Sequence, residues 1–300
     1  SVDFSVDTTI GMMLGAQDRG YPLFYTQLPQ ILLNEGVVET TAQRVTLDEA
    51  AGKRGEEWYR LSAPETIIFG ADDIVLQRKD PPFNMHYIHG TYLLELMERQ
   101  GAFICNRPDS LRDCNEKMFT TWFPQFCPPT LVTSQSDKIK AFIEKHHDTI
   151  VKPLDGMGGS SIFRVAKGDP NLNVILETLT EENQTSVMVQ RYVPEITKGD
   201  KRIILINGDP IPHLLARIPA ENETRGNLAA GATGVVQPLS KRDYEIANAL
   251  APELKKRGLY FVGLDVIGDY ITEINVTSPT GIRQIDDATG SFIGRDLIDA

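Results

Sequence analysis

Positive charge, cysteine and long apolar runs are all scarce in this sequence. Its 300 residues carry 30 lysines and arginines against 41 aspartates and glutamates, a net charge of −11. With no basic stripe, this acidity argues against binding to nucleic acid. No apolar run approaches the length of a membrane span, so a membrane is not an expected partner either. In so acidic a chain, a cluster of lysines and arginines is an informative sign of an anionic substrate.

The few cysteines lie far apart. Cys105, Cys114 and Cys127 lack the spacing of metal ligands, and we interpret them as small packed residues in a reducing compartment. The first residues, SVDFSVDTT, have neither the basic region nor the apolar core of a secretion signal. Both observations favour the cytoplasm. With 41% hydrophobic and 24% charged residues, the chain has the composition of a globular protein of two or more domains.

Apolar runs and amphipathic segments alternate along most of the chain, which predicts an α/β (α+β) fold. We expect strands at 21–25, 66–69, 73–76, 102–105, 149–152, 161–165, 186–193, 202–206 and 211–218. Helices are expected at 87–98, 137–146, 171–180 and 241–257. A further helix is expected from Asp113 to about residue 123, with Glu116 completing a capping box at its start. Residues 34–57 give no clear pattern.

Residues 260–280 have the pattern of a β-hairpin, with a Gly-Asp turn between two apolar runs. If the loop has three residues, 268–270, then Asp265 lies opposite Glu273, and Asn275 shares their face because side chains alternate along a strand. The other face is apolar and is expected to enter the core through Val262, Leu264, Val266, Ile274 and Val276.

Two carboxylates and an amide oxygen on one face are ligands that suit Mg²⁺, a hard cation that binds through oxygen and substrate phosphates. The alternative is a surface hairpin with a solvated acidic face. The pattern alone favours neither interpretation. The ligand hypothesis depends on the register, since a slip of one residue would separate Asp265 from Glu273 and Asn275.

A glycine-rich loop spans residues 155–161 and follows Lys152, the last residue of a predicted strand. Gly156, Gly158 and Gly159 would let backbone N–H groups approach phosphate oxygens without obstruction. The loop has neither the Gly-Lys-Ser/Thr ending of a Walker loop nor the third glycine of a dinucleotide fingerprint. A strand follows it, which is typical of a flap over a nucleotide. An ordinary glycine-rich hairpin turn is the alternative, although a turn needs fewer residues.

Several basic residues fall beside these features: Lys117, Lys152, Arg202, Arg217 and Arg225. Each alone would usually be a solvated surface charge. Arg217 is different because it follows an apolar strand, where a cation needs an anionic partner. Arg225 lies in the segment 221–234, which has three glycines and few apolar residues and is typical of a mobile lid.

Five longer motifs carry a resemblance: RKDPPFN (78–84), NRPDSLRDCNEKMFT (106–120), KPLDGMGGSSIFRV (152–165), TRGNLAAG (224–231) and FVGLDVIGDYITEINVTSPTGIR (261–283). Together they resemble bacterial-type glutathione synthetases of the ATP-grasp superfamily, from about Ile10 to the end. RKDPPF and EINVTSPT are specific to that family, whereas the hairpin and the glycine flap are shared with other ATP-grasp ligases. Family members open with a short apolar strand, and none precedes Ile10 here.

The resemblance implies an ATP-grasp fold preceded by an N-terminal α/β domain. Residues 1–112 would form this substrate-binding domain, 113–193 a central subdomain with the glycine flap, and 194–300 a catalytic subdomain with the metal hairpin and the mobile loop. It also implies the ligation of γ-glutamylcysteine and glycine to glutathione, driven by ATP through an acyl phosphate. The expected cofactors are ATP and Mg²⁺, with Mn²⁺ as a substitute. The expected assembly is a homo-oligomer, commonly a tetramer in this family.

The resemblance also implies site residues. ATP would be bound by Lys117, Lys152, Gly156, Gly158, Gly159, Ser160, Gln190, Tyr192, Val193 and Asp200. The metal would be bound by Asp265, Glu273 and Asn275. The catalytic arginines would be Arg202, Arg217 and Arg225, and the peptide and glycine would contact Arg78, Ser278, Thr280 and also Asn275. Two alternatives remain open, namely an ATP-grasp ligase for another substrate, such as a D-alanine or glutamate-adding ligase, and a non-catalytic nucleotide-binding module.

Overall fold

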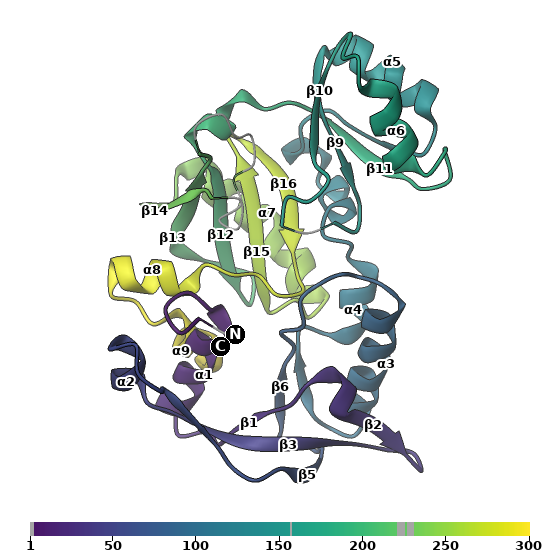
Figure 1. Cartoon of the computed structure of the whole chain (residues 1–300). Helices are drawn as coiled ribbons and strands as arrows, with labels where there is room; N and C mark the ends of the chain where they lie inside the picture. Colours follow the sequence, from purple (N-terminus) through teal and green to yellow (C-terminus); the bar gives the residue numbers. More distant parts are fainter. Residues whose placement is uncertain (1–2, 157, 221–225, 227–230) are drawn as a thin grey trace.

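The computed structural model of the chain describes residues 3–156, 158–220, 226 and 231–300. The molecule has three parts (Figure 1). An N-terminal part with a long curved sheet lies below a central antiparallel sheet, and a smaller sheet with two helices projects beside it. In the described residues no helix is long and apolar enough to cross a bilayer.

The N-terminal sheet is built around one long strand, β3 (Val37–Leu47), which pairs with all four of its partners. These are β1 (Leu23–Tyr25), β2 (Ile31–Asn34), β4 (Tyr59–Leu61) and β5 (Glu65–Ile68). Val38, Thr40 and Ala42 of β3 are buried in alternation, and after a shift of one position at residues 43–44 Val45 and Leu47 are buried as well. The sequence pattern is unclear here because small or polar residues, Thr40 and Ala42, fill two of the buried positions.

The strands expected at 73–76 and 102–105 and the helix expected at 87–98 are confirmed, and they form a βαβ unit. The parallel strands β6 (Ile74–Leu76) and β7 (Phe103–Cys105) are joined by α3 (Met85–Arg99), whose N-cap Asn84 accepts from the N–H of Tyr87. Two further helices of this part are α2 (Glu49–Lys53) and α4 (Pro108–Asp113).

The small sheet has the order β10-β9-β11-β8 and carries the glycine-rich loop. Its strands are β8 (Thr130–Thr133), β9 (Asp148–Pro153), β10 (Phe163–Ala166) and β11 (Val187–Arg191), all antiparallel. Helices α5 (Ser136–His146) and α6 (Leu172–Thr180) cover one face, and their apolar side chains form a core of their own with Val151, Val165 and Val189. The loop between β9 and β10 is thus held at the edge of an independently packed unit.

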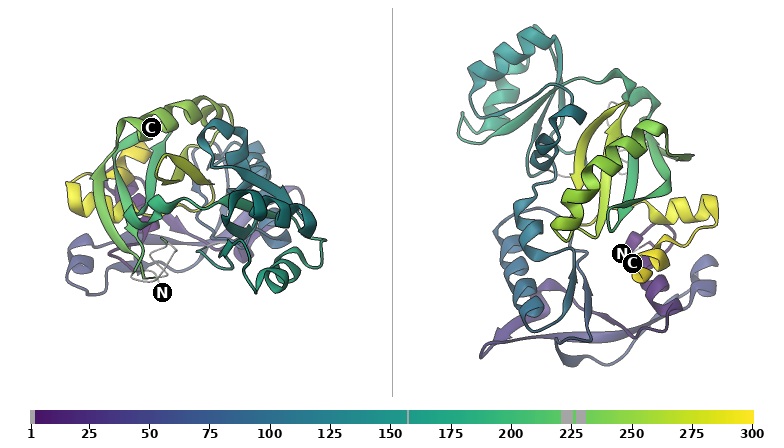
Figure 2. Two further views of the ribbon diagram at one scale, coloured as in Figure 1. Left: turned by 90° about the horizontal axis from the view of Figure 1, so that it is seen from above. Right: turned by 180° about the vertical axis from the view of Figure 1, so that it is seen from behind.

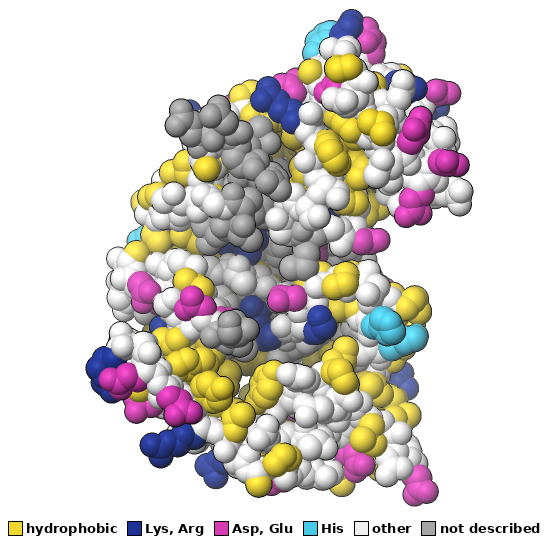
Figure 3. All heavy atoms as spheres, in the orientation of Figure 1, with side chains coloured by type: hydrophobic (Ala, Val, Ile, Leu, Met, Phe, Trp, Pro, Cys, Tyr) yellow, Lys and Arg dark blue, Asp and Glu magenta, His cyan; other side chains and the backbone are white. Residues whose placement is uncertain are grey.

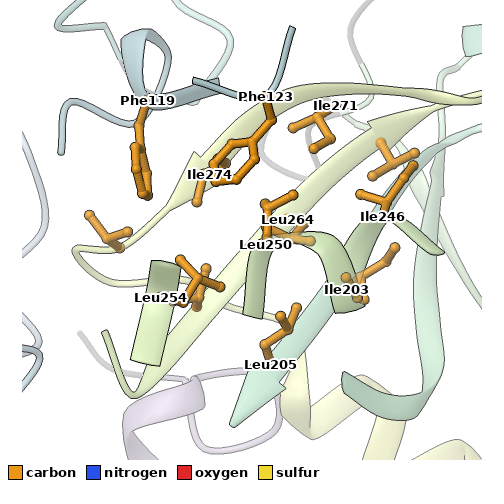
Figure 4. Close-up of a cluster of buried hydrophobic side chains, with 14 of the residues drawn as sticks. Phe119, Phe123, Ile203, Leu205, Ile246, Leu250, Leu254, Leu264, Ile271 and Ile274 are labelled. Carbon is orange, nitrogen blue, oxygen red and sulfur yellow. The ribbon is translucent and has the colours of Figure 1, made fainter. Parts of the chain in front are cut away.

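The central sheet has the order β14-β13-β12-β15-β16. Its strands are β12 (Asp200–Ile206), β13 (Asp209–Ile218), β14 (Thr233–Pro238), β15 (Phe261–Ile267) and β16 (Tyr270–Asn275). One face is covered by α7 (Lys241–Lys256), which begins at a capping box formed by Ser240 and Asp243. Figure 4 shows the resulting core, in which residues of α7, the strands and the segment near Phe119 interdigitate, and Figure 2 shows α7 lying across the sheet from behind.

The two ends of the chain are packed together beneath the opposite face of this sheet. Helix α1 (Thr8–Asp18) crosses α9 (Ile293–Asp299) so closely that a Cβ on Gly15 would lie 2.4 Å from the backbone of Gly294. Only glycine permits this approach. With α8 (Ile282–Thr289), these helices cover the part of the face that is apolar, leaving the remaining part for charged side chains.

The hairpin register is confirmed at its predicted pairs, but the predicted loop length is wrong. Asp265 pairs with Glu273, as expected, although Ile267 pairs with Tyr270 across a two-residue turn. A bulge at Thr272 supplies the extra residue and restores the register. As a consequence Ile271 turns to the core and is fully buried.

The helix expected from Asp113 to about residue 123 is also wrong. Asp113 is the last residue of α4, and only a short 3-10 turn, Met118–Trp122, follows. The carboxylate of Glu116 does not cap a helix, since it accepts hydrogen bonds from Val276 and Thr277 instead. A tertiary interaction thus replaces the local one that the sequence suggested.

Candidate active site

A cluster of two arginines and two aspartates lies on the central sheet and follows from strand pairing. Arg202 of β12 is directly opposite Asp265 of β15. Its Nε donates to Oδ1 at 2.6 Å and its Nη2 to Oδ2 at 3.0 Å, the forked geometry that guanidinium and carboxylate groups favour. Its Nη1 donates to the carbonyl oxygen of Thr280 at 3.2 Å, so the same arginine reaches the segment after the hairpin.

The second pair of the cluster is Arg217 and Asp200, which are opposite each other on β13 and β12. Nη2 of Arg217 lies 2.5 Å from Oδ2 of Asp200 and 2.9 Å from Oδ2 of Asp265, so Arg217 joins both aspartates. All four residues of this arginine cluster are between 3 and 9% exposed. Its two positive and two negative charges balance.

The charges of the arginine cluster control one another. Burial alone would raise the pKa of Asp265, but Arg202 and Arg217 outweigh it and hold this pKa well below its usual range. Burial likewise opposes the charge of Arg217, whose pKa is nevertheless raised by Asp200 and Asp265. For Asp200 burial prevails over the single contact with Arg217, and its pKa rises to about 6.

A second group, the lysine cluster, consists of Lys117, Lys152 and Glu273. Nζ of Lys117 lies 3.1 Å from Oε1 of Glu273 and also donates to the carbonyl oxygen of Gly156. Among the described residues, the carbonyl oxygen of Thr272, at 3.1 Å, is the only hydrogen-bond acceptor of Lys152, which is 6% exposed. Burial lowers the pKa of Lys152 to about 8, with a contribution from Lys117 that Glu273 opposes.

The glycine-rich loop lies against the lysine cluster. It follows β9, and Gly158 and Gly159 have φ values of 62° and 78°, a region that glycine adopts without strain. Nδ2 of Asn115 donates to the carbonyl oxygen of Leu154 at 3.3 Å, near the start of the loop. Lys117, bonded to Gly156, therefore touches the loop and the hairpin at once. Ser160 is exposed.

A cavity lies where the loop, the hairpin end and the N-terminal part meet. Residues from all three line it, among them Phe83, Lys117, Asp155, Gly156 and Thr277. In the view of Figure 3, lysine and arginine side chains lie in the middle of this face, between the small sheet above and the N-terminal part below. This is the local concentration of positive charge that an acidic chain needs in order to bind an anion.

The three oxygen ligands predicted from the hairpin lie on one face. Asp265 is on β15, Glu273 is on β16, and Asn275 is the last residue of β16. Asp265 and Glu273 are cross-strand neighbours, and Asn275 donates from Nδ2 to the carbonyl oxygen of Gly263 at 3.1 Å, which directs its amide oxygen away from that strand. No group of three or more His, Cys, Asp or Glu suited to a metal occurs in the described ranges. Two carboxylates and an amide oxygen nevertheless fit a hard divalent cation that also binds phosphate oxygens.

The residues predicted for the base and ribose of ATP are less tightly grouped. The amide of Gln190 donates to Oγ1 of Thr130 at 3.1 Å, and the ring of Tyr192 lies 3.8 Å beneath the guanidinium of Arg164. Val193 is buried at the end of the same segment. Asp200, the predicted ribose ligand, instead has its carboxylate on Arg217. Its Oδ1 has no hydrogen-bond partner in the described part of the chain.

The predicted peptide-site residues come together around the segment after the hairpin. Arg78 donates to Oγ1 of Thr9 at 3.3 Å and to the carbonyl oxygen of Ser278 at 3.4 Å. Ser278 Oγ donates to Oδ1 of Asp80 at 2.5 Å. Burial lowers the pKa of Arg78 to about 10. Since Arg202 bonds the carbonyl of Thr280, this segment links Arg78 to the arginine cluster.

One predicted catalytic residue cannot be located. Arg225 and most of the predicted lid 221–234 lie outside the described residues, which resume at Gly226 and at residue 231. Gly226 lies close to Asp200, where an added Cβ would approach the Cβ of Asp200 to 2.5 Å.

Sequence reasoning missed two residues that hold the hairpin from outside. The buried amide of Asn106 donates to the carbonyl oxygens of Phe261 at 2.8 Å and Val276 at 2.7 Å, and accepts from the N–H of Phe261. The carboxylate of Glu116 accepts from the N–H groups of Val276 and Thr277. Both lie in the motif NRPDSLRDCNEKMFT (106–120). Within that motif, only Lys117 was predicted as a site residue, because its charge suits a phosphate.

Two family models match the chain: the prokaryotic glutathione synthetase N-terminal domain over residues 1–112, and the ATP-grasp domain of the same enzyme over residues 116–290. Among curated relatives, the glutathione synthetase of Vibrio parahaemolyticus is 53% identical over 300 residues, covering 100% of this chain and 94% of that protein. The glutathione synthetase of Pseudomonas aeruginosa is 53% identical over 299 residues, covering 100% and 93%.

Solved structures agree on the fold. The ATP-grasp ligase PsnB, complexed with a minimal precursor, is 18% identical, with a TM-score of 0.63 over 97% of this chain and 93% of that one. A RiPP-associated ATP-grasp ligase of Chryseobacterium gregarium, solved with ADP and a leader and core peptide, is 14% identical, with a TM-score of 0.63 over 100% and 93%. At such identities the likeness concerns the ATP-grasp fold alone.

Proposed function

The chain belongs to the prokaryotic glutathione synthetase family, and from this premise we propose that it joins γ-glutamylcysteine to glycine at the expense of ATP. The observation that carries the proposal is the convergence of Lys117 and Lys152 on the acidic face of the hairpin, beneath a glycine-rich loop. Such a site binds a polyphosphate and places its terminal phosphoryl group beside a second, anionic substrate.

The reaction needs two steps because a carboxylate is a poor electrophile. In the first, an oxygen of the cysteinyl α-carboxylate attacks the γ-phosphorus of ATP, the bond to the β-phosphate oxygen breaks, and ADP leaves. In the second, the amine of glycine attacks the acyl carbon, and the C–O bond to the phosphate breaks as the amide forms. Inorganic phosphate leaves and the amine loses a proton. Both steps rely mainly on positioning and on stabilisation of developing charge.

The lysine cluster is suited to hold the phosphates. It has one more positive charge than negative, and within the described ranges Lys152 has a backbone carbonyl as its only hydrogen-bond partner. A buried cation without a counterion is costly, so an incoming phosphate stabilises it. Backbone N–H groups from Gly158 to Ser160 would contribute further, and we assign Lys117, Lys152, Gly156, Gly158, Gly159 and Ser160 to the phosphates. Gln190, Tyr192 and Val193 are assigned to the base.

Asp265, Glu273 and Asn275 would hold Mg²⁺, or Mn²⁺ in its place. When bound, the metal would supply positive charge that neutralises the phosphate oxygens. Two of these ligands already have partners, because Lys117 bonds Glu273 and two arginines bond Asp265. These cations must release the carboxylates in part before the metal can bind. Phosphate groups are alternative partners for both kinds of cation, so nucleotide and metal are expected to bind together.

Arg202 and Arg217 would stabilise the acyl phosphate and the tetrahedral centre that follows it. Before substrates bind, their guanidinium groups are held in place by Asp265 and Asp200. We keep Asp200 as a ribose ligand only on condition that it leaves Arg217. Arg225 and the remainder of the segment 221–234 are proposed as a lid that keeps water from the acyl phosphate.

The N-terminal part would bind the peptide. Arg78, Ser278 and Thr280 are assigned to the peptide and glycine, and the backbone bonds from Arg78 and Arg202 to Ser278 and Thr280 support this. We further propose the three-part division at 1–112, 113–193 and 194–300. A cytoplasmic homo-oligomer is also proposed, with a tetramer expected. Support for self-association comes from exposed apolar side chains of the N-terminal sheet, Leu32, Leu33, Tyr59, Leu61 and Ile68.

The test measures phosphate release by the purified chain in three mixtures: ATP with γ-glutamylcysteine and glycine, ATP with D-alanine, and ATP alone. Release in the first mixture only, with one glutathione formed per phosphate, is the expected result. Release with D-alanine would indicate a different carboxylate–amine ligase. No release in any mixture, despite binding of ATP, would indicate a nucleotide-binding module and would refute the proposed function.

A further inference from the structure

The segment Asn115-Glu116-Lys117 touches three parts of the site with three consecutive side chains. Asn115 bonds the start of the glycine-rich loop and Lys117 bonds Glu273 on the hairpin. Glu116, between them, bonds the end of the hairpin. Of these three, only Lys117 carries a charge that the proposed chemistry uses directly.

The contacts of Glu116 concern the strand that carries two of the three predicted metal ligands. Its backbone carbonyl accepts the N–H of Ile274 at 2.8 Å, the residue between Glu273 and Asn275. Its carboxylate oxygen Oε1 accepts the N–H of Val276 at 2.8 Å, and the N–H and Oγ1 of Thr277, both at 2.9 Å. β16 is the outer strand of the central sheet, and its free edge would otherwise leave these donors without partners.

Burial and the nearby charge of Glu273 raise the pKa of Glu116, although the hydrogen bonds from Thr277 and Val276 oppose this. A carboxylate kept so near a second carboxylate costs free energy that these hydrogen bonds must offset.

We propose that Glu116 is a positioning residue for the ligation. It fixes the position of Glu273 and Asn275, the predicted metal ligands on β16, relative to Lys117. It thereby sets the distance between these metal ligands and the lysine that holds the phosphates. Lys117 is the next residue in the chain, so the same backbone unit holds the phosphate lysine and the strand of the metal ligands. The inference rests on the proposed function for its substrates, but its central claim concerns the geometry of metal and nucleotide binding.

The experiment compares Glu116→Ala and Glu116→Gln with a matched pair, Asp286→Ala and Asp286→Asn. Asp286 is also buried and has a pKa raised by burial, and its Oδ1 accepts a hydroxyl, Ser291 Oγ at 2.8 Å, and a backbone N–H, Ile293 at 2.9 Å. It lies on α8, away from the hairpin end. The two pairs therefore remove the same kinds of hydrogen bond in and outside the site.

Binding of Mn²⁺ in the presence of ADP is measured by electron paramagnetic resonance, together with the thermal midpoint and kcat. We expect Glu116→Ala to weaken Mn²⁺ binding about tenfold or more and to lower kcat by a similar factor, since displacements near 1 Å can cost up to about a hundredfold. Glu116→Gln keeps an acceptor oxygen and should stay within about threefold of wild type. Both Asp286 variants should lower the thermal midpoint without changing Mn²⁺ binding.

Equal Mn²⁺ affinity in Glu116→Ala and Asp286→Ala would overturn the proposal, as would a Glu116→Gln variant as impaired as Glu116→Ala. If Glu116→Ala fails to fold, Thr277→Val replaces it, because this change removes one of the three hydrogen bonds, and an unchanged Mn²⁺ affinity there would also overturn it. Wild type that binds Mn²⁺ and ADP but makes no glutathione would refute the proposed function without touching this inference.

Discussion

The arginine cluster and the lysine cluster lie on the same face of the central sheet and differ in how their charges are balanced. The arginine cluster pairs two guanidinium groups with two carboxylates across neighbouring strands. The lysine cluster has two ammonium groups and one carboxylate, and in the part of the chain that the structure describes Lys152 is bonded to a backbone carbonyl alone. The charges of the first cluster balance without substrate. The second cluster has one more positive charge than negative, which an anion from outside can balance.

The choice of side chain fits each task. Guanidinium groups hold a fixed planar fork and remain charged when buried, which suits a rigid arrangement around a reaction centre. An ammonium group is a compact charge whose pKa shifts with burial, which suits a site that changes its state when phosphate arrives. The structure shows both behaviours: the pKa of Arg217 is raised by its partners, whereas burial lowers that of Lys152 to about 8.

The largest test of this comparison is Asp265→Asn, which leaves Arg202 and Arg217 buried without the charge that they share. We expect the free energy of unfolding to fall by about 3–5 kcal/mol, the usual cost of breaking a buried ion pair, and kcat to fall by at least about a hundredfold. Urea unfolding and glutathione formation measure the two effects.

The matched control for Asp265 is Asp243→Asn. Asp243 is 1% exposed and is bonded to Lys201, so its loss also breaks a buried ion pair, but it caps α7 outside the site. It should lower stability and leave kcat per folded molecule unchanged. If Asp265→Asn has a stability and a kcat near those of wild type, the arginine cluster does not depend on equal numbers of positive and negative charges. The proposed difference between the two clusters would then be wrong.

Lys152→Met makes the opposite prediction for stability. Lys152 is a buried cation with no carboxylate partner among the described residues. Its removal should leave the free energy of unfolding unchanged or raise it by about 1–2 kcal/mol, since replacing buried charge with apolar groups is often neutral or stabilising. ATP affinity, measured by calorimetry, should fall by about tenfold to a hundredfold. Lys167→Met, an exposed lysine near the same sheet, should change neither. A Lys152→Met protein that is much less stable than wild type would show that the lysine cluster is structural.

Much of this site could be predicted from sequence because its strands alternate regularly. The pairing of Asp265 with Glu273 follows from two apolar runs and a turn, and it holds even though the loop is one residue shorter than expected. The bulge that compensates is stabilised by Thr272, whose Oγ1 donates to the carbonyl of Asp265 at 3.2 Å. The shorter loop and the bulge each shift the register by one residue, and the two shifts cancel at Asp265 and Glu273. The local sequence pattern does not distinguish this arrangement from a three-residue loop without a bulge.

The long-range pairings could not be predicted. Arg202 meets Asp265 and Arg217 meets Asp200 only because β12 pairs with both β15 and β13, which brings together residues that are 63 and 17 positions apart in the chain. Glu116 was assigned to a helix start for the same reason, since its partners Val276 and Thr277 lie 160 and 161 residues away. β3 was missed because Thr40 and Ala42 weaken its apolar alternation. Local patterns indicate which residues share a face, but not which faces meet.

The smallest effect predicted by the comparison is a proton taken up when nucleotide binds. The pKa of Lys152 is lowered from its usual 10.5 to about 8 in the folded protein, so near pH 8 about half of the molecules carry a neutral lysine. Because the unfolded chain binds more protons between pH 8 and 10.5, wild type should gain stability relative to Lys152→Met as the pH rises through that range.

An ADP phosphate beside Lys152 favours the ammonium form and should raise its pKa again. Calorimetric titrations with ADP in two buffers of different ionisation enthalpy should therefore reveal uptake of about half a proton near pH 8 and about a tenth near pH 7. The phosphates of ADP are fully ionised at pH 8, so Lys152 is the expected acceptor, and Lys152→Met should take up none. An uptake that persists in that variant would assign the proton to another group and would remove the main chemical difference between the two clusters.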